Sequence, residues 1–354
     1  MASSPLRMYR VVLFSSISQV SESLLRSSLP PCMQLEIVDD DALGGDGVTV
    51  GFDPSRLGRA ARDALSRAEV LVSEPSVVSA VLRHDPYAFP SLRWCQSTYA
   101  GVDPFFDGDS DIVSSPPPWK LTRFAGIFGP PIAEWCLARI IGHERSFAAT
   151  AGDQKRRQWA GSRGAVTKYR YLSSMTLSIL GAGDIGRCIG RAAQSFGMRT
   201  VGYARTARRS GDGVDEYVTD LGAALRAGDY VVSVLPSTHG TKGMLSGGAL
   251  AAASRENGGR RPVLINVGRG DVVDDASLLE ALEKEYLSAA ILDVFGTEPL
   301  PKTSPLWDRD DVVVSPHVSG VTRAEDVPEV FLENYRRYIN GEELLYGVDW
   351  SKGY

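Results

Sequence analysis

TLSILGAGDIG, residues 176–186, joins a short apolar run to the pattern G-x-G-x-x-G. The residues that follow, up to Phe196, have helical spacing, so the segment predicts a strand, a tight turn and a helix. Glycines at such a turn let the backbone approach a pyrophosphate closely, and the helix N-terminus offers free N–H groups to that anion. The residues that we predict to bind a dinucleotide here are Gly181, Gly183, Asp184, Ile185 and Gly186.

Alternating strands and helices extend on both sides of this turn. The runs expected to form further strands are Tyr9–Phe14, Leu35–Val38, Val70–Val72, Leu92–Gln96, Thr200–Tyr203, Tyr230–Leu235, Val263–Val267, Ala289–Leu292 and Val312–Val314. Helical stretches such as Asp275–Glu285 separate the later runs, whereas 150–175 is polar and predicts a loop. Apolar strands between helices indicate parallel sheets covered on both faces. Because 354 residues exceed what one core usually serves, we expect an α/β protein of two domains.

The residues after the second strand of this rhythm bear on the choice of cofactor. An NAD site usually places Asp or Glu there, to hold the ribose 2′-hydroxyl. This chain has Arg205, Thr206 and Arg208 instead, and no acid before Asp212. A guanidinium binds a 2′-phosphate that a carboxylate would repel, so the sequence favours NADP(H) over NAD(H). A solvated basic turn is the alternative interpretation of these residues.

Polar residues follow three of the later strands. Arg269 comes after Val263–Val267, Asp293 follows Ala289–Leu292 directly with Glu298 five residues on, and His317 follows Val312–Val314. In an open parallel sheet ligands bind beyond the carboxyl ends of the strands, so these four side chains should converge near the nicotinamide.

The residue types fit the reduction of a 2-keto acid. Histidine suits the transfer of a proton to the carbonyl oxygen, and a carboxylate such as Glu298 would fix its tautomer. An arginine such as Arg269 can pair with the substrate carboxylate and polarise the carbonyl. Each residue alone has a structural alternative: a strand-end histidine, a turn arginine and a solvated loop acid. All three together, beside a dinucleotide motif, favour catalysis.

Composition narrows the remaining classes. The net charge of −5 gives no basic surface for nucleic acid or an anionic membrane, and no apolar run is long enough for a membrane helix. Four scattered cysteines without a histidine cluster argue against disulfides and against a metal site. The run 132–147 predicts a helix that is apolar on several sides, which we interpret as a domain connector and dimer contact. We expect a cytoplasmic homodimer.

The chain resembles the D-isomer-specific 2-hydroxyacid dehydrogenases. The matching stretches are LGAGDIG (180–186), INVGRG (265–270), DVFGTEPLP (293–301), PLW (305–307) and SPH (315–317), which together span most of 130–320. The resemblance implies that Arg269, Glu298 and His317 form the catalytic triad. It also implies that Asp293 contacts the nicotinamide side. Further cofactor contacts are expected at Pro236, Val267 and Gly268.

The resemblance extends to the N-terminal half. STYAGVD, residues 97–103, is similar to the family loop whose N–H groups hold the substrate carboxylate, which implies roles for Tyr99, Ala100 and Gly101. The family fold implies two Rossmann-like doubly wound domains with cofactor and substrate in the cleft between them. Residues 1–128 with 322–354 would bind substrate, and 129–321 would bind the dinucleotide.

The C-terminal stretch 348–354 is similar to the glyoxylate and hydroxypyruvate reductase type. We therefore predict an NADP-dependent reductase of a small 2-keto acid. Two alternatives stay open. One is a nicotinamide-sensing binding protein related to corepressors of this superfamily, which can keep the triad. The other is an NAD-linked dehydrogenase that works in the oxidative direction.

Overall fold

The computed structural model describes residues 7–17, 19–44, 52–106, 112, 115–159, 163–253 and 261–353. Contacts divide the chain into two compact units, Met1–Gly126 with Thr322–Tyr354, and Ile127–Val321. The first sequence-based boundary, after residue 128, lies two residues beyond the first of these units, and the return point at 322 is the same. Each unit contains one parallel sheet, which confirms the predicted α/β class.

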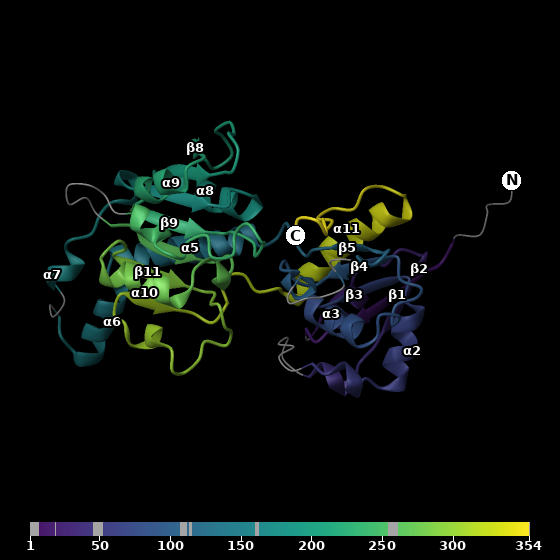
Figure 1. Ribbon diagram of the computed structural model, residues 1–354. Helices are drawn as coiled ribbons and strands as arrows, with labels where there is room; N and C mark the ends of the chain where they lie inside the picture. Colours follow the sequence, from purple (N-terminus) through teal and green to yellow (C-terminus); the bar gives the residue numbers. More distant parts are fainter. Residues whose placement is uncertain are drawn as a thin grey trace. The chain divides into compact units, whose positions relative to one another are not determined.

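The first unit is a five-stranded sheet in the order β2-β1-β3-β4-β5, with every neighbouring pair parallel. Its strands are β1 Tyr9–Phe14, β2 Met33–Ile37, β3 Val70–Ser73, β4 Trp94–Ser97 and β5 Lys120–Thr122. Its helices are α1 Val20–Arg26, α2 Arg59–Arg67, α3 Pro75–His84 and α11 Val327–Ile339. In Figure 1 the yellow helix α11, from the end of the chain, lies with the purple and blue strands of the N-terminal segment.

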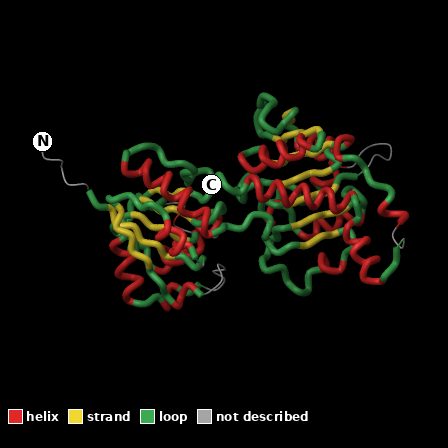
Figure 2. Tube along the Cα trace, turned by 180° about the vertical axis from the view of Figure 1, so that it is seen from behind, coloured by secondary structure: helices red, strands yellow, loops and turns green. Residues whose placement is uncertain are grey.

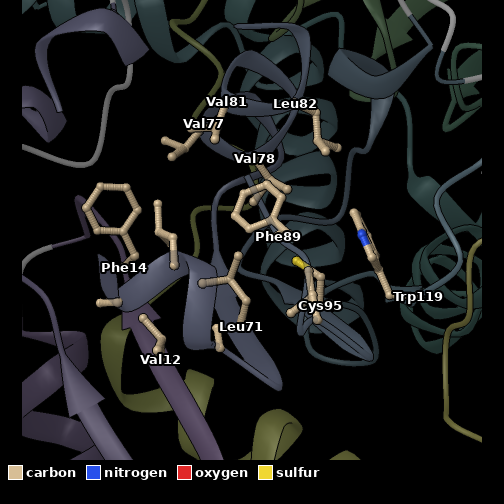
Figure 3. Close-up of a cluster of buried hydrophobic side chains, with 14 of the residues drawn as sticks. Val12, Phe14, Leu71, Val77, Val78, Val81, Leu82, Phe89, Cys95 and Trp119 are labelled. Carbon is tan, nitrogen blue, oxygen red and sulfur yellow. The ribbon is translucent and has the colours of Figure 1, made fainter. Parts of the chain in front are cut away.

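Apolar side chains on α3 hold it against the sheet of the first unit. Figure 3 shows Val77, Val78 and Val81 beside side chains from β1, β3 and β4, all of them buried. Pro75 stands in the first turn of α3, where its missing N–H costs nothing. Packing and the proline together fix where this helix begins, directly after β3.

The second unit is a seven-stranded parallel sheet in the order β12-β11-β10-β9-β6-β7-β8. Its strands are β6 Thr176–Leu180, β7 Arg199–Tyr203, β8 Glu216–Val218, β9 Tyr230–Ser233, β10 Val263–Asn266, β11 Ala289–Leu292 and β12 Val312–Val314. Its helices are α5 Gly129–Glu144, α6 Phe147–Arg156, α7 Arg163–Val166, α8 Asp184–Ser195, α9 Leu221–Ala227 and α10 Asp275–Glu283. In Figure 2 red helices lie on either side of the yellow strands of this unit.

Four elements differ from the sequence-based expectation. The strands β5 and β8 have three residues each and are partly exposed, so no apolar run in the sequence predicts them. The prediction of a loop over 150–175 was wrong, because α6 covers Phe147–Arg156 and α7 follows it. Asp153 is the buried residue of α6, so this helix carries no apolar stripe for pattern analysis to detect.

None of the helices in the described ranges is long and apolar enough to cross a membrane.

Candidate functional site

The glycine-rich turn connects β6 to α8. Gly183 caps α8 without a side-chain hydrogen bond, so the N–H groups of the first helical turn stay available to an anion. A Cβ at Gly186 would lie 2.3 Å from the carbonyl oxygen of Gly181, which only glycine avoids. The sheet order reverses here, with β7 on one side of β6 and β9 on the other. Such a switch point is where open α/β sheets bind ligands.

The basic turn after β7 is open to solvent. Arg205, Thr206 and Arg208 are exposed, and no hydrogen bond or ion pair with the rest of the described chain takes them up. Asp212, the first acid after β7, pairs with Arg187 across 3.2 Å and also with Arg191. The Asp212 carboxylate is therefore neutralised by two arginines of α8. The N–H donors of Arg205 and Arg208 are exposed and available to a ligand.

The polar residues of the second sheet stand at three neighbouring strand ends. Arg269, Asp293 and His317 follow β10, β11 and β12, which are adjacent in the sheet. The N–H of Asp293 donates to the carbonyl of Asn266 at 3.0 Å, and that of His317 donates to the carbonyl of Asp293 at 2.9 Å. Backbone hydrogen bonds thus set these residues in one row at the carboxyl edge.

His317 and Glu298 form a hydrogen-bonded pair. Nδ1 of His317 lies 2.8 Å from Oε2 of Glu298, and Oε1 of Glu298 accepts the N–H of Phe295 at 2.9 Å. Partial burial raises the pKa of Glu298, but the hydrogen bonds from His317 and Phe295 and the charges of His317 and Arg269 outweigh it. The net pKa is below the usual value. Glu298 is therefore a carboxylate at neutral pH, and the pair breaks only as the pH falls through this lowered pKa.

Asp293 is the buried anchor of the histidine loop. Its Oδ1 accepts the Ser315 hydroxyl at 2.6 Å and the Val318 N–H at 2.9 Å, and its Oδ2 accepts the Ser319 N–H at 2.8 Å. His317 has a φ of +53°, a region that non-glycine residues rarely adopt. The hydrogen bonds on either side of it hold that conformation. The expected contact of Asp293 with the nicotinamide side stays a prediction, and Ser315 is a residue of this anchor that sequence reasoning missed.

Arg269 is half-buried beside this row. Its Nη1 donates to the carbonyl of Gly268 at 2.8 Å, and the side chain of Asn266 holds its carbonyl oxygen at 2.9 Å. A Cβ at Gly270 would lie 1.9 Å from the carbonyl carbon of Phe295, so the Arg269 loop packs directly on the loop that carries Glu298. This close approach sets the spacing of the two side chains.

We expect Gly270→Ala to lower the free energy of unfolding by about 1–3 kcal/mol, the usual effect of overpacking, and to lower activity with it. The added methyl group can be accommodated only if the backbone of Phe295 moves. Denaturant titration with a kcat measurement checks this. Gly296→Ala is the matched control, since a Cβ there meets nothing within 4 Å. Equal stability of the two variants would contradict the proposed packing.

The loop after β4 in the first unit offers two backbone donors. The N–H of Tyr99 is taken by the Ser97 hydroxyl at 3.0 Å. Within the described chain no hydrogen bond takes up the N–H of Ala100 or of Gly101, and both residues are half-buried. Of the three residues expected to bind the substrate carboxylate, Ala100 and Gly101 therefore present open N–H groups, while that of Tyr99 is engaged.

Pro236, Val267 and Gly268 follow β9 and β10, and β9 is the neighbour of β6, the strand that leads into the glycine-rich turn. Pro236 comes three residues after β9, and Val267 and Gly268 follow β10 directly, so all three stand at the carboxyl edge of the second sheet. Their contacts with cofactor stay predictions. Across the described ranges, no group of three His, Cys, Asp or Glu side chains is placed to hold a metal ion.

The family follows from the sequence of the second unit. Residues 137–319, more than half of the chain, match the family model described as D-isomer specific 2-hydroxyacid dehydrogenase, NAD binding domain. The chain belongs to this family. The resemblance drawn from the motifs is thereby confirmed.

Relatives of this 2-hydroxyacid dehydrogenase cover both units. Glyoxylate/hydroxypyruvate reductase B of Serratia proteamaculans is 31% identical over 267 residues, which are 74% of this chain and 77% of that protein. A family member from Aeromonas salmonicida superposes with a TM-score of 0.79 at 30% identity, over 97% of this chain and 99% of that one. An NADPH-dependent glyoxylate/hydroxypyruvate reductase from Sinorhizobium meliloti, in complex with NADP and sulfate, gives 0.76 at 27% identity, over 98% and 100%. The dehydrogenase is thus an NAD(P)-linked oxidoreductase of the glyoxylate/hydroxypyruvate reductase-like type.

Proposed function

We propose that this dehydrogenase uses NADPH to reduce a small 2-keto acid of the glyoxylate or hydroxypyruvate type to the D-2-hydroxy acid. The observation that carries the proposal is the 2.8 Å pair of His317 and Glu298, held at the carboxyl edge by buried Asp293. A histidine whose far nitrogen is held by a carboxylate presents the other nitrogen for proton transfer.

The residues fit a phosphorylated dinucleotide. Open N–H groups at the start of α8 suit the pyrophosphate, and the exposed guanidinium groups of Arg205 and Arg208 suit a 2′-phosphate. When bound, the nicotinamide supplies the hydride. The Sinorhizobium meliloti reductase, described with NADP, is similar over nearly the whole chain, which supports the same cofactor here.

His317 gives its proton to the substrate carbonyl oxygen from Nε2, and Glu298 stabilises the charged imidazole before that step. Arg269 binds the substrate carboxylate and polarises the carbonyl. The N–H groups of Ala100 and Gly101 complete the binding of the carboxylate. In the oxidative direction His317 would accept the proton instead.

Homodimer formation stays a prediction.

The test is absorbance at 340 nm with glyoxylate, hydroxypyruvate, pyruvate and phenylpyruvate, each with NADPH and with NADH. We expect oxidation of NADPH to be faster, and glyoxylate or hydroxypyruvate to be the preferred substrate. Faster turnover with NADH would contradict the cofactor assignment. Binding of NADPH without turnover of any of the four acids would contradict the reductase assignment.

A further inference from the structure

The switch point of the first sheet carries a buried acid. The order β2-β1-β3-β4-β5 places β2 on one side of β1 and β3 on the other, so the chain leaves β1 and β3 toward opposite sides. Ligands of open α/β sheets bind at such a point, beyond the carboxyl ends of the strands. Ser15 follows β1 there, and Glu74 follows β3.

Glu74 is fully buried, and in the described part of the chain only one of its two carboxyl oxygens accepts hydrogen bonds. Its Oε1 accepts the Ser15 hydroxyl at 2.5 Å and the Ser16 N–H at 3.1 Å. Its Oε2 has no hydrogen-bond partner in the described part of the chain. In the described part of the chain the side-chain oxygens of Ser16, Ser73 and Thr98 share that property, and they stand at or just beyond the ends of β1, β3 and β4. Buried polar atoms without partners are rare in proteins, so their concentration at one sheet edge indicates a functional site.

The loop after β4, residues 97–103, for which we propose anion binding and which we call the anion-binding loop, begins next to this acid. Thr98 donates its N–H to the carbonyl of Ser73, the residue before Glu74, at 3.1 Å. Two residues further on, the open N–H groups of Ala100 and Gly101 follow. Glu74 therefore lies between the loop after β1, which it holds, and the loop that offers its donors to an anion.

Electrostatics link Glu74 to that loop. Burial raises the pKa of Glu74, and the hydrogen bonds from Ser15 and Ser16 offset this only in part. Burial also raises the pKa of Tyr99, and the charge of Glu74 raises it further. A negative charge that acts on the Tyr99 hydroxyl also repels a carboxylate bound to the same loop, by an amount that depends on their separation.

The titratable and charged groups near Glu74 belong to the elements packed around it. Cys95 on β4 and Tyr99 after it are titratable groups that interact with Glu74, and burial raises the pKa of both. The first turn of α3 has no acid, and Ser15 and Ser16 are uncharged. Arg123, which follows β5, is a cation at the same edge, separated from β3 by β4.

We propose that Glu74 is a positioning residue of the reductase: its buried carboxyl group holds the loop after β1 beside the loop of Ala100 and Gly101, and a negative charge on it weakens binding of the anionic substrate. The substrate carboxylate at Ala100 and Gly101 is taken from the proposed function. Since a carboxyl group loses its proton as the pH rises, substrate binding should weaken at high pH, while the rate of the bound complex is unaffected by Glu74.

The experiment measures the dissociation constant of oxamate, a non-reducible 2-keto acid analogue, on the full chain loaded with NADPH, from about pH 6 to about pH 9. In the wild type we expect the constant to rise over this range by about tenfold more than in Glu74→Gln, the effect of one added charge. In turnover assays the same difference should appear in KM and not in kcat.

Ser15→Ala provides an independent variant. The Ser15 hydroxyl lowers the pKa of Glu74, so its removal should move the weakening of oxamate binding to higher pH. A merely structural role of Glu74 predicts no such movement. If Glu74→Gln does not fold, as thermal unfolding would show, the Ser15→Ala shift decides.

Parallel pH curves for wild type and folded Glu74→Gln would overturn the proposal, as would an unshifted Ser15→Ala curve or the absence of oxamate binding at every pH. Turnover of glyoxylate without a Glu74-dependent oxamate curve would contradict this inference alone. A Glu74-dependent curve without turnover of any 2-keto acid would contradict the proposed function alone.

Discussion

Replacing His317 by Gln should lower kcat for 2-keto acid reduction by about 10²–10⁴-fold, the usual contribution of a general acid. Glutamine keeps a hydrogen-bonding side chain opposite Glu298 but cannot release a proton to the carbonyl oxygen. The affinity for NADPH should not change, because the turn before α8 and the arginines after β7 are untouched. Stopped-flow or steady-state absorbance at 340 nm, together with fluorescence titration of NADPH, measures both quantities.

His84→Gln is the matched control, since this exposed histidine stands in the last turn of α3 and has no assigned role. Glu298→Gln should give a smaller loss of kcat than His317→Gln, because the imidazole remains but loses the carboxylate that orients it. Unchanged kcat in His317→Gln would remove histidine from the mechanism, whatever the control shows.

The double substitution of Arg205 and Arg208 by Ser should lower kcat/KM for NADPH by about 10²-fold and leave that for NADH unchanged. Two charge-assisted hydrogen bonds to a phosphate contribute about 1.5–3 kcal/mol each, less where solvent screens them. NADH lacks the 2′-phosphate and so loses nothing. The ratio of the two kcat/KM values is the measurement, and it is independent of protein concentration.

Arg59→Ser, at an exposed arginine of the first unit, is the control for a general loss of positive charge. An equal loss with both cofactors would mean that the turn supports the fold and does not read the phosphate. If kcat/KM falls with neither NADPH nor NADH, the turn is a solvated basic loop, which was the alternative interpretation.

The local signals of the sequence were sufficient for most of the second unit. The apolar runs at β10, β11 and β12 are each followed by a polar residue that the structure places at the carboxyl edge, and β6 runs into the glycine-rich turn. The glycine pattern and the arginines after β7 likewise act through residues close in sequence. These features depend on strand propensity, turn chemistry and charge, which are properties of short segments.

The first unit shows where this reasoning was incomplete. Glu74 follows the buried strand β3 in the same way that Asp293 follows β11, so the signal that identified Asp293 was also present there. It was missed because no motif surrounds it. Glu74 is fully buried, and one of its oxygens has no hydrogen-bond partner among the described residues, because β1 and β4 lie on either side of β3. No local sequence pattern predicts that arrangement.

By itself, then, the sequence determined the α/β class, the dinucleotide turn and the residue types at the strand ends, because each is a property of a short segment. Only the tertiary structure decided that Asp293 anchors a loop 22–26 residues further along the chain, that Gly270 meets Phe295, and that the Tyr99 N–H is already engaged. Strand pairing, hydrogen bonds between distant residues and close backbone approach form only when segments far apart in the sequence pack together, so their geometry cannot be read from any one of them.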